Sequence, residues 1–384
     1  MSDIITLPNT SDRLVIANSL SHVNADQWDA LTGGHPCLQH AWLHSLEATG
    51  CASPATGWNG QHLLLYRDST LAAALPLYLK THSRGEYVFD YAWANAWHRY
   101  GMAYYPKALG AVPFTPVPGP RLLAWHPADK QTLVQGAIEL CRQQRISSLH
   151  ILFPNDDDRG VMQSNGMLLR QNVQFHWHNH GYQKFDDFLA DLNQKNRKKI
   201  NQARRKLEAE GVHFQWFEGT EISDEALGFF YRCYYQTYLE HGNLPYLSQA
   251  FFERIRALQP ETLVVVLALR NNTPIAAALN LRGPDALYGR YWGAVEFVSG
   301  LHFETCYMQG IKYCIERGLS AFEGGAQGEH KLARGLLPSK TWSAHWIGDD
   351  HFRDAIATWL ADEDLAVNAY IDELQRHSPY RQAD

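Results

Sequence analysis

The sequence predicts an α+β chain in which one structural unit of about half the length occurs twice. Residues 62–77 and residues 263–281 resemble each other, and each reads as two apolar runs around a short polar turn, which is typical of a β-hairpin. The dipeptide Gln-Gly at 135–136, and again at 309–310, begins a helical stretch that leads into a short apolar strand. The length of 384 residues also suits two domains of roughly 150 to 200 residues.

The expected elements follow one order in both halves: strand, helices, hairpin, further strand, helix and strand. The hairpin turns are residues 67–69 and residues 270–272, where polar residues interrupt β-branched and Leu-rich runs. The first Gln-Gly helix is expected to end near Arg145. The second is expected to end at Arg317, because the following Gly318 suits a helix C-cap.

A single boundary is expected between the halves, giving an N-terminal domain of 1–165 and a C-terminal domain of 166–384. The polar run at 155–160 reads as a loop, and a new strand begins at Leu168. Near the C-terminus, residues 351–376 carry apolar side chains at broadly helical spacing, which predicts a packing helix.

Composition is that of an ordinary folded protein, with 45% hydrophobic and 19% charged residues. No stretch of about 18 apolar residues could span a bilayer, and the first residues lack the features of a signal peptide. We therefore expect a cytoplasmic protein. The net charge of −6 argues against a general nucleic-acid coat but allows a local basic patch. The six cysteines show no zinc-like spacing, which indicates reduced, mostly buried thiols.

Residues 323–335 are the most informative stretch for function, since they follow an apolar strand and are rich in polar chemistry. Four glycines allow a close backbone approach to a ligand. Two carboxylates, an imidazole, an ammonium and a guanidinium occur within thirteen residues and supply proton-transfer and anion-binding groups. This combination predicts the reactive part of an enzyme.

Several strings, including Phe175-His-Trp-His-Asn179 and Gly325-Ala-Gln-Gly-Glu-His-Lys331, together resemble the FemAB-like branch of predicted N-acyltransferases, labelled peptidoglycan biosynthesis/recognition. The resemblance extends over nearly the whole chain. The other stretches that carry it are residues 89–93, 104–106, 111–116, 119–122, 181–182 and 185–188 and the basic segment 195–206.

The resemblance implies two tandem GNAT-like domains, a cleft associated mainly with the second, and transfer of an acyl or aminoacyl group to an amine in a bacterial cell. The donor is then acyl-CoA or aminoacyl-tRNA, used as a cosubstrate, with no permanently bound cofactor. The acceptor is the amine of a small molecule or peptide. The alternative is a noncatalytic module that recognises a cell-wall precursor or peptide through an aromatic cleft.

Acyl transfer to an amine needs a base and donors for the oxyanion, and the 323–335 stretch offers three candidates for proton transfer. In a GNAT-like domain, Glu323 would lie where two central strands splay apart, and it is the first candidate base; the alternative is a salt-bridge carboxylate. Glu329 and His330 are adjacent, so they should point in different directions, one to the cleft and one to support the loop. Lys331 and Arg334 share a helical spacing and are candidates for binding an anion, either phosphate or a substrate carboxylate.

The segment 195–206 has seven basic residues and no acidic ones, and its composition suits a helix. The spacing of seven between Arg197 and Arg204 makes one face continuously basic, and Lys198 extends it. This face could hold the phosphates of coenzyme A or a tRNA backbone. The alternative is a solvated charged face.

His176, His178 and His180 alternate along an expected strand and would project from one face. Phe175 and Trp177 on the other face look like core, and no Cys or acidic partner follows at a zinc-like interval, so no metal site is predicted. His176 and His178 are candidates for substrate binding instead.

Three polar-tipped rings flank the turn at 242–245, and they are further candidates for lining the acceptor pocket: Tyr238, His241 and Tyr246. Packing of these rings within the core and loops is the alternative.

The sequence does not decide between acyl-CoA and aminoacyl-tRNA as the donor. An acyl-CoA site is normally a glycine-rich turn at a helix N-terminus, where free N–H groups hold the pyrophosphate. Here the loop at 295–300 carries Glu296, a carboxylate where positive charge would help. The inserted coiled-coil arm of tRNA-dependent FemAB-type enzymes also has no counterpart, because no long heptad pattern occurs in the second half.

Overall fold

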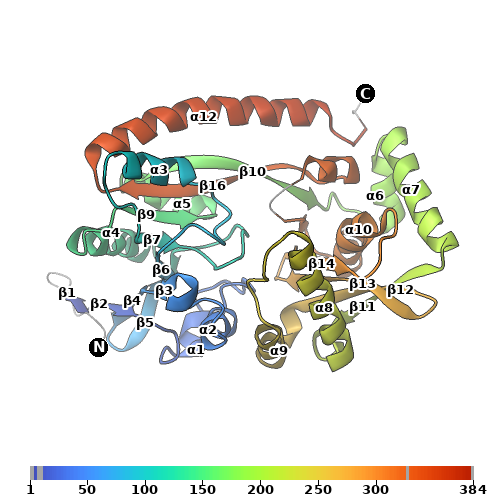
Figure 1. Ribbon diagram of the computed structural model, residues 1–384, viewed down its shortest axis with the longest axis horizontal. Helices are drawn as coiled ribbons and strands as arrows, with labels where there is room; N and C mark the ends of the chain where they lie inside the picture. The colour runs from blue at the N-terminus through green and yellow to red at the C-terminus, as the bar shows by residue number, and fades with distance from the viewer. Residues whose placement is uncertain (1–3, 7–11, 326–327, 382–384) are drawn as a thin grey trace. The chain divides into compact units, whose positions relative to one another are not determined.

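The computed structural model describes residues 4–6, 12–325 and 328–381 of the chain. It divides into two compact units: unit 1 consists of Met1–Asn172 and Lys340–Ala369, and unit 2 of Val173–Ser339 and Tyr370–Asp384. Figure 1 shows the helices and strands, coloured along the chain. Each unit is therefore built from two separate segments of the chain.

Unit 1 is a mixed helix and sheet unit. Its elements in chain order are β1 (Ile4–Thr6), β2 (Arg13–Ala17), α1 (Ala25–Asp29), α2 (His40–Ala48), η1 (Pro54–Thr56), β3 (Trp58–Gly60), β4 (His62–Arg67), β5 (Thr70–Leu75), β6 (Leu77–Lys80), α3 (Tyr91–Arg99), β7 (Lys107–Gly110), β8 (Leu123–Ala124), α4 (Pro127–Gln143), β9 (Ser148–Leu152) and α5 (Asp156–Ser164). Unit 1 also includes the first part of β10 (Leu168–His178), most of β16 (Leu337–Ile347) and most of α12 (Asp350–Arg376).

Strand pairing in unit 1 begins with β2, β4 and β5, which are antiparallel in that order. After Pro76 the chain continues as β6, which pairs antiparallel with β7. β7 then pairs parallel with β9, and β9 pairs antiparallel with β16. A parallel pair needs a crossover connection, and α4 lies within it; its buried face, including Leu133 and Ala137, packs against Leu63 and Leu65 of β4.

Unit 2 contains the remaining elements. They are α6 (Phe185–Asp191), α7 (Gln194–Ala209), β11 (Val212–Glu218), η2 (Gly219–Glu221), α8 (Asp224–Glu240), α9 (Gln249–Leu258), η3 (Pro260–Thr262), β12 (Leu263–Arg270), β13 (Thr273–Arg282), β14 (Ala286–Ala294), α10 (Leu301–Phe303), the π-helical η4 (Glu304–Met308), α11 (Gln309–Arg317), β15 (Ala321–Glu323) and η5 (Glu329–Arg334). The last part of β10, the first part of β16 and the end of α12 complete it.

Strand pairing in unit 2 repeats the order found in unit 1. β11, β12, β13 and β14 are antiparallel neighbours, β14 pairs parallel with β15, and β15 pairs antiparallel with β10. The crossover between the parallel strands is the continuous helical segment α10, η4 and α11. The predicted duplicated α+β unit is confirmed by this shared topology.

The last strand of each repeat is exchanged between the units. β10 follows the first repeat in sequence but pairs with β15 of unit 2, whereas β16 follows the second repeat and pairs with β9 of unit 1. For this reason the compact units are discontinuous in sequence, and the boundary expected between residues 165 and 166 stays a prediction about the repeats. Long-range strand pairing leaves no local sequence signal from which the exchange could be read.

Local sequence signals account for several boundaries. Asn271 and Asn272 have φ values of 50° and 63° in the turn between β12 and β13, a conformation that Asn tolerates well. Gly318 ends α11 with a φ of 67°, as expected for a C-cap glycine. Both predicted hairpins are present, as β4–β5 and β12–β13, and the predicted C-terminal helix is α12.

Gly293 of β14 is packed so closely that it gives a sharp stability prediction. A Cβ atom added to Gly293 would lie 2.0 Å from the backbone oxygen of Cys233 in α8. We expect Gly293→Ala to lower the free energy of unfolding, measured in urea, by about 3 kcal/mol, because α8 must shift away from β14. Gly228→Ala in the same helix is the control: its Cβ would have no atom within 4 Å, so a gain of about 0.5–1 kcal/mol is expected. Equal stability of parent and Gly293→Ala would contradict this packing.

Candidate active site

The parallel strands β14 and β15 separate at one point in unit 2. They pair only from Ala286 to Tyr288 on β14 and from Ala321 to Glu323 on β15. Beyond this point β14 continues to Ala294, whereas β15 ends at Glu323. Glu323 therefore lies at the splay between two central strands, as the resemblance implied.

Glycines after Glu323 turn the chain tightly at the splay. A Cβ on Gly324 would lie 2.6 Å from a methyl carbon of Leu336, and Gly325 has a φ of 86°. Ala326 and Gln327, which belong to the predicted reactive stretch, lie outside the described residues. The stretch resumes at Gly328 and forms η5, a 3₁₀-helix that carries Glu329, His330, Lys331 and Arg334.

Glu323 faces His176 across the antiparallel pair β10–β15, and Glu323 Oε2 lies 4.0 Å from His176 Nε2. Burial lowers the pKa of His176 to about 3, with smaller contributions from His178 and Lys331. His176 is therefore neutral at pH 7, and its Nε2–H can donate to Gln174 Oε1 at 3.2 Å. A half-buried carboxylate thus lies beside a neutral imidazole that cannot neutralise it.

Lys331 is almost completely buried, with an exposed fraction of 2%. Its Nζ donates a hydrogen bond to the backbone oxygen of Gly325 at 2.7 Å and lies 5.9 Å from the ring centre of Tyr307. Burial lowers the pKa of Lys331 to about 8, although nearby Cys306 opposes the shift. Below that pH the site holds a poorly solvated ammonium, next to the turn that follows Glu323.

The side chains of His330, Tyr307 and Arg334 form the outer part of the site. The Tyr307 hydroxyl lies 3.2 Å from His330 Nε2, and burial raises the Tyr307 pKa, so its hydroxyl stays protonated. Partial burial lowers the pKa of His330, and the positive charges of Lys331 and Arg334 lower it further. The Arg334 guanidinium lies 3.9 Å from the ring centre of Phe303. These groups form a hydrogen-bonding, cationic rim.

Glu329 contacts the end of α12. Its Oε1 accepts a hydrogen bond of 2.6 Å from the hydroxyl of Tyr370 near the end of α12, and its side chain is exposed. The sequence-based expectation that Glu329 and His330 diverge fits this arrangement, since Glu329 contacts α12 and His330 contacts Tyr307. Which group acts as base stays a prediction.

The π-helical segment η4 brings in residues that sequence reasoning missed. It places the Tyr307 hydroxyl beside His330, and it places Glu304 3.3 Å from Arg204 Nε of α7. π-helical turns occur often at functional sites. The only sequence signal was the cluster of aromatic and imidazole side chains in residues 302–307, just after Gly300.

A cavity of about 1290 Å³ lies beside this cluster. Its walls are the C-terminal half of α8, the end of β14, the loop at 295–300 and α10. His302 and Phe303 line it and also contact the site: the ring centres of His302 and His330 are 6.3 Å apart, and Arg334 lies over Phe303. The cavity therefore adjoins the reactive cluster through His302 and Phe303.

The predicted substrate-binding residues separate into two groups. His241 lines the cavity. Tyr238 and Tyr246 pack against each other with ring centres 5.9 Å apart and are not part of its lining. His178 lies exposed on β10 opposite Ala321, two residues from His176.

The basic helix α7 presents two faces. Its inner face packs through Ile200, Ala203 and Leu207, and Ala203 Cβ lies 3.7 Å from the Cβ position of Gly300. Arg204 belongs to this face: it pairs with the buried Glu304 and lies 4.7 Å from the ring centre of Phe185.

The predicted anion-binding residues of α7 are therefore not equivalent. Arg197 is half-buried and donates to the backbone oxygen of Ala190 at 3.4 Å. Lys198 is exposed, as are Lys195 and Lys199. The exposed lysines are better placed to meet an anion than Arg204, whose partner Glu304 is already present.

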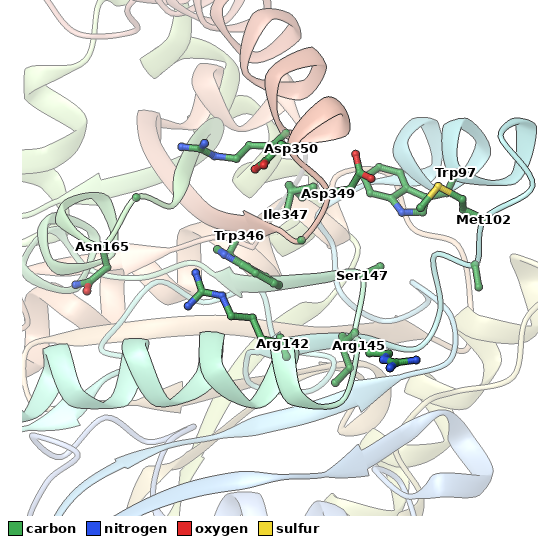
Figure 2. A pocket seen from close by; sticks show the side chains of 16 residues that line it. Trp97, Met102, Arg142, Arg145, Ser147, Asn165, Trp346, Ile347, Asp349 and Asp350 are labelled. Carbon is green, nitrogen blue, oxygen red and sulfur yellow. The ribbon is translucent and has the colours of Figure 1, made fainter. Parts of the chain in front are cut away.

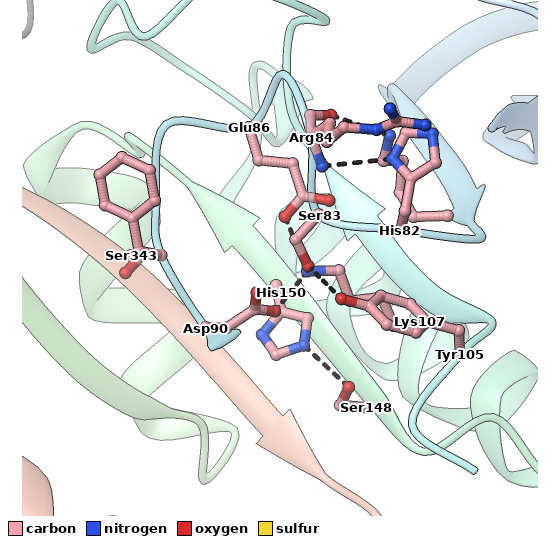
Figure 3. A network of polar contacts seen from close by, with 12 residues as sticks. His82, Ser83, Arg84, Glu86, Asp90, Tyr105, Lys107, Ser148, His150 and Ser343 are labelled. Atoms are coloured by element: carbon pink, nitrogen blue, oxygen red, sulfur yellow. Dashed lines mark hydrogen bonds and ion pairs between the residues drawn. The ribbon is translucent and has the colours of Figure 1, made fainter. Parts of the chain in front are cut away.

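Unit 1 has a counterpart of this site in which the polar side chains are buried. His150 of β9 faces His345 of β16 in the same way that Glu323 faces His176, so His150 occupies the position of Glu323 in the repeat. Around it, Lys107 Nζ donates to Glu86 at 2.7 Å and to Ser83 at 2.8 Å, as Figure 3 shows. Buried charges are tolerated only when paired in this way.

Asp90 also binds Lys107, and its second partner is the Tyr104 hydroxyl at 2.6 Å. Burial alone would raise the Asp90 pKa, but Lys107 and the hydrogen bonds lower it to about 2. His150 Nδ1 and His345 Nδ1 are 2.6 Å apart, which requires that one ring donates and the other accepts. The remaining Nε2 atoms each lie 2.8 Å from a serine hydroxyl.

This histidine pair predicts a loss of stability in mild acid. Burial lowers the pKa of His150 to about 3 and that of His345 well below its usual value of 6.5. Between pH 6.5 and about 3 the unfolded chain therefore binds protons that the folded chain does not, so the free energy of unfolding falls as pH falls. Burial raises the pKa of Glu86 to about 7, so in the same pH range the folded chain binds a proton there that the unfolded chain does not. This opposes the effect of the histidines, but it involves one proton, whereas the two histidines involve two.

Urea unfolding between pH 7 and 4 measures this effect. The double variant His150→Gln/His345→Gln should be less stable at pH 7 but should depend less on pH than the parent. The charged groups that act on the pair are Asp90, Lys107 and Arg170, and all three are unchanged in the variant. Identical pH dependence of parent and variant would contradict the assignment.

A separate cavity of about 680 Å³ lies in unit 1 and is shown in Figure 2. It is lined by the ends of α3 and α4 and by the chain around the junction of β16 and α12. Arg142 lies beside Trp346, with its guanidinium carbon 5.8 Å from the ring centre. None of the groups described above as reactive lies in this cavity.

Within residues 4–6, 12–325 and 328–381, no three His, Cys, Asp or Glu side chains gather in a way that could hold a metal ion. Among the helices of the same residues, none combines the length and apolar character needed to cross a membrane.

Two repeated units, each with a parallel strand pair, together with a match to a family model, assign the chain to the tandem GNAT-like acyl or aminoacyl transferases. The chain belongs to the FemAB-like family, described as peptidoglycan biosynthesis/recognition, whose model matches residues 19–382. The resemblance identified from the sequence is confirmed. A comparison with curated proteins found no match.

Solved structures support the same fold. The chain is similar to FemX at a TM-score of 0.55 and 13% identity, covering 88% of this chain and 99% of that one. It is also similar to L-PGS from Bacillus licheniformis at a TM-score of 0.53 and 10% identity, covering 85% and 93%. The predicted fold class of two tandem GNAT-like domains is thereby confirmed. The family description links the chain to peptidoglycan biosynthesis or recognition.

Proposed function

We propose that unit 2 transfers an acyl or aminoacyl group from an activated donor to the amine of a peptide-like acceptor, with Glu323 as general base and Lys331 as oxyanion stabiliser. The observation that carries this proposal is that both residues lie beside the glycine turn that follows the β14–β15 splay. A half-buried carboxylate precedes the glycine turn, and a buried ammonium binds the backbone oxygen of that turn. The two charges required by amide formation are therefore present within one loop.

The reaction follows from this placement. The acceptor nitrogen attacks the donor carbonyl carbon, a C–N bond forms, and the carbonyl π electrons move to the oxygen. Glu323 accepts the proton that the nitrogen loses, and the Lys331 ammonium stabilises the negative oxygen. When the oxyanion collapses, the bond to the donor's thiolate or alkoxide breaks, and that leaving group takes up one proton. The products are an amide and a free thiol or hydroxyl.

The outer groups suit the leaving-group side of this reaction. The Tyr307 hydroxyl beside His330 offers a proton route, because Tyr307 stays protonated and His330 is neutral near pH 7. Arg334 keeps its charge next to Phe303 and can bind an anionic part of donor or acceptor. Removing His330 should therefore slow the step in which the leaving group departs.

The donor is an acyl-CoA or an aminoacyl-tRNA, both of which are polyanions and neither of which is a permanently bound cofactor. The exposed lysines of α7 supply positive charge on a helix that contacts both η5 and the position of Gly300. Both donors occur in the bacterial cytoplasm, and we place the reaction there.

Charge reversal on α7 tests the donor side. We expect Lys195→Glu/Lys198→Glu/Lys199→Glu to weaken donor binding about 10-fold or more at low salt and to flatten its salt dependence, because phosphate contacts are lost. Folding should be unaffected, since all three side chains are exposed. Arg204 is left intact because a carboxylate there would face the buried Glu304.

The control is an equal change of charge on unit 1, made at three exposed arginines: Arg84, Arg99 and Arg145. That variant should bind the donor like the parent. Equal weakening of donor binding in both variants would indicate a nonspecific effect of net charge. Unchanged donor affinity in the α7 variant would show that the lysines of α7 form only a solvated charged face.

The proposed function itself is tested by turnover. Purified protein is incubated with a panel of acyl-CoAs and a panel of aminoacyl-tRNAs, each with peptide amines, and amide formation is followed by mass spectrometry. We expect one donor class to give an amide that Glu323→Gln forms at least 100-fold more slowly. Binding of acceptors without turnover of any donor would support the noncatalytic alternative.

A further inference from the structure

The cavity beside the reactive cluster is larger than a small acetyl or alanyl group requires, and much of its wall is apolar. Its volume of about 1290 Å³ exceeds the 300–1,000 Å³ of ordinary small-molecule sites. Trp292, Phe303 and Val298 line it, together with Tyr231 and Tyr235 of α8. Apolar and aromatic side chains therefore form most of the wall between α8 and α10.

The polar groups of this wall are largely engaged with their neighbours. The Thr237 hydroxyl lies 3.1 Å from the backbone oxygens of both Cys233 and Trp292. His241 Nδ1 lies 2.7 Å from the backbone oxygen of Thr237. Gln236 donates to Glu240 at 3.1 Å, and Gln249 donates to Glu253 at 2.8 Å. Groups satisfied in this way do not converge on a polar ligand.

The charged side chains of the wall do not form a cationic site, because Arg232 is accompanied by Glu240 and Glu296. Glu296, on the loop where a GNAT-like site would hold pyrophosphate, pairs with Arg270. The helix after this loop has a carboxylate, Glu304, in its first turns, and α10 has only three residues before the π-helical segment. The loop at 295–300 therefore lacks the glycine-rich sequence and the positive side chains of a usual pyrophosphate site.

The rim of the cavity carries two apolar side chains exposed to water on one loop. Phe297 is 95% exposed and Val295 is 54% exposed, and both line the cavity. Neighbouring exposed apolar side chains at the mouth of an apolar cavity are typical of a surface that a ligand covers.

We propose that this cavity binds the long apolar chain of an acyl donor, so that the group transferred by unit 2 is a fatty acyl group. The inference rests on the proposed function. The chain lies between α8 and the loop at 295–300, and its carbonyl end lies toward His302 and Phe303, which contact His330 and Arg334. Burial lowers the pKa of His302 to about 4, so a neutral ring lines the end nearest the reaction.

Apolar burial would also compensate for the missing phosphate cradle. Each methylene removed from water raises affinity roughly three- to four-fold, so a chain of ten or more carbons can supply the binding that a pyrophosphate site supplies elsewhere. An acyl-CoA could then bind through its chain, with its phosphates near the exposed lysines of α7.

The first experiment measures chain binding without turnover. Fluorescence of a dansyl-labelled undecanoic acid is followed on adding protein, and acyl-CoAs of 2, 4, 8, 12 and 16 carbons compete for it. We expect the competitor affinity to rise by at least 100-fold from 4 to 12 carbons. Flat affinity across this series, or no binding of the probe, overturns the inference.

The second experiment localises the site. Val295→Asp/Phe297→Ser should weaken the 12-carbon competitor about 10-fold, and folding should be retained because both side chains are exposed. Leu365→Ser, at a 72% exposed residue of α12, is the matched control and should bind like the parent. Equal affinity of the double variant and the control overturns the placement of the chain.

Turnover separates this inference from the proposed function. If Glu323→Gln abolishes amide formation but kcat/KM does not depend on chain length, the transferase assignment stands and the fatty acyl group is excluded. If chain binding behaves as expected but no acyl-CoA is turned over, the cavity assignment stands and the proposed reaction is wrong.

Discussion

Glu323→Gln is expected to lower kcat by roughly 10²- to 10⁴-fold while the protein stays folded and still binds its substrates. Glutamine keeps the size and hydrogen-bonding ability of the side chain but cannot accept the amine proton. His176 cannot replace it readily, because its pKa is about 3 and its Nε2 is hydrogen-bonded to Gln174. The measurement is steady-state amide formation together with thermal unfolding.

The pH dependence of the variant identifies the role of Glu323. If Glu323 is the base, the rate of Glu323→Gln relative to the parent should rise with pH, since the amine then loses its proton without help and the titration of Lys331 affects both proteins alike. Glu329→Gln is the matched control, because Glu329 is exposed and bound to Tyr370, and it should retain most of the activity. A stability loss in Glu323→Gln with no such pH dependence would show that Glu323 is structural.

Lys331→Met is expected to lower kcat by about 10²- to 10³-fold, the usual effect of removing one oxyanion donor. Methionine fills a similar volume and needs no hydration, so burial should not unfold the variant; the Gly325 oxygen loses its donor at a modest cost. KM for the donor should change less than kcat, because the contact strengthens only as the oxyanion forms.

The pKa of Lys331 adds a second test of this role. Because burial lowers the pKa of Lys331 to about 8, its stabilising charge should be lost, and parent activity should fall, as pH rises through 8. This fall should be absent from the residual activity of Lys331→Met. Lys198→Met, at an exposed lysine of α7, controls for loss of a positive charge. Full activity of Lys331→Met would place oxyanion stabilisation elsewhere.

Much of the architecture could be predicted from the sequence because its signals are local. The hairpins were visible as paired apolar runs, and the end of α11 was visible as Gly318. The exchange of β10 and β16 could not be predicted, since it depends on pairing between strands distant in sequence. The repeat itself was visible because both halves preserve the same local pattern.

The candidate site was predicted in part for the same reason. Glu323, His330 and Lys331 stood out because they occur in one short stretch with glycines. Tyr307 was missed because a π-helical segment, which leaves no clear sequence pattern, sets its direction. The basic segment predicts Arg204 as an anion-binding residue, and its pairing with Glu304 leaves no local pattern because the two residues are distant in sequence.

The most direct test of the central claim is a single-turnover measurement of amide formation with the donor class that gives an amide in the turnover assay. It compares the parent with Glu323→Gln and Lys331→Met in unit 2, and with Arg142→Ala in the cavity of unit 1. The account predicts that both unit 2 variants form the amide at least 100-fold more slowly, and that Arg142→Ala matches the parent. Equal rates in all four proteins, or a large loss only in Arg142→Ala, would contradict the placement of the reaction at the β14–β15 splay.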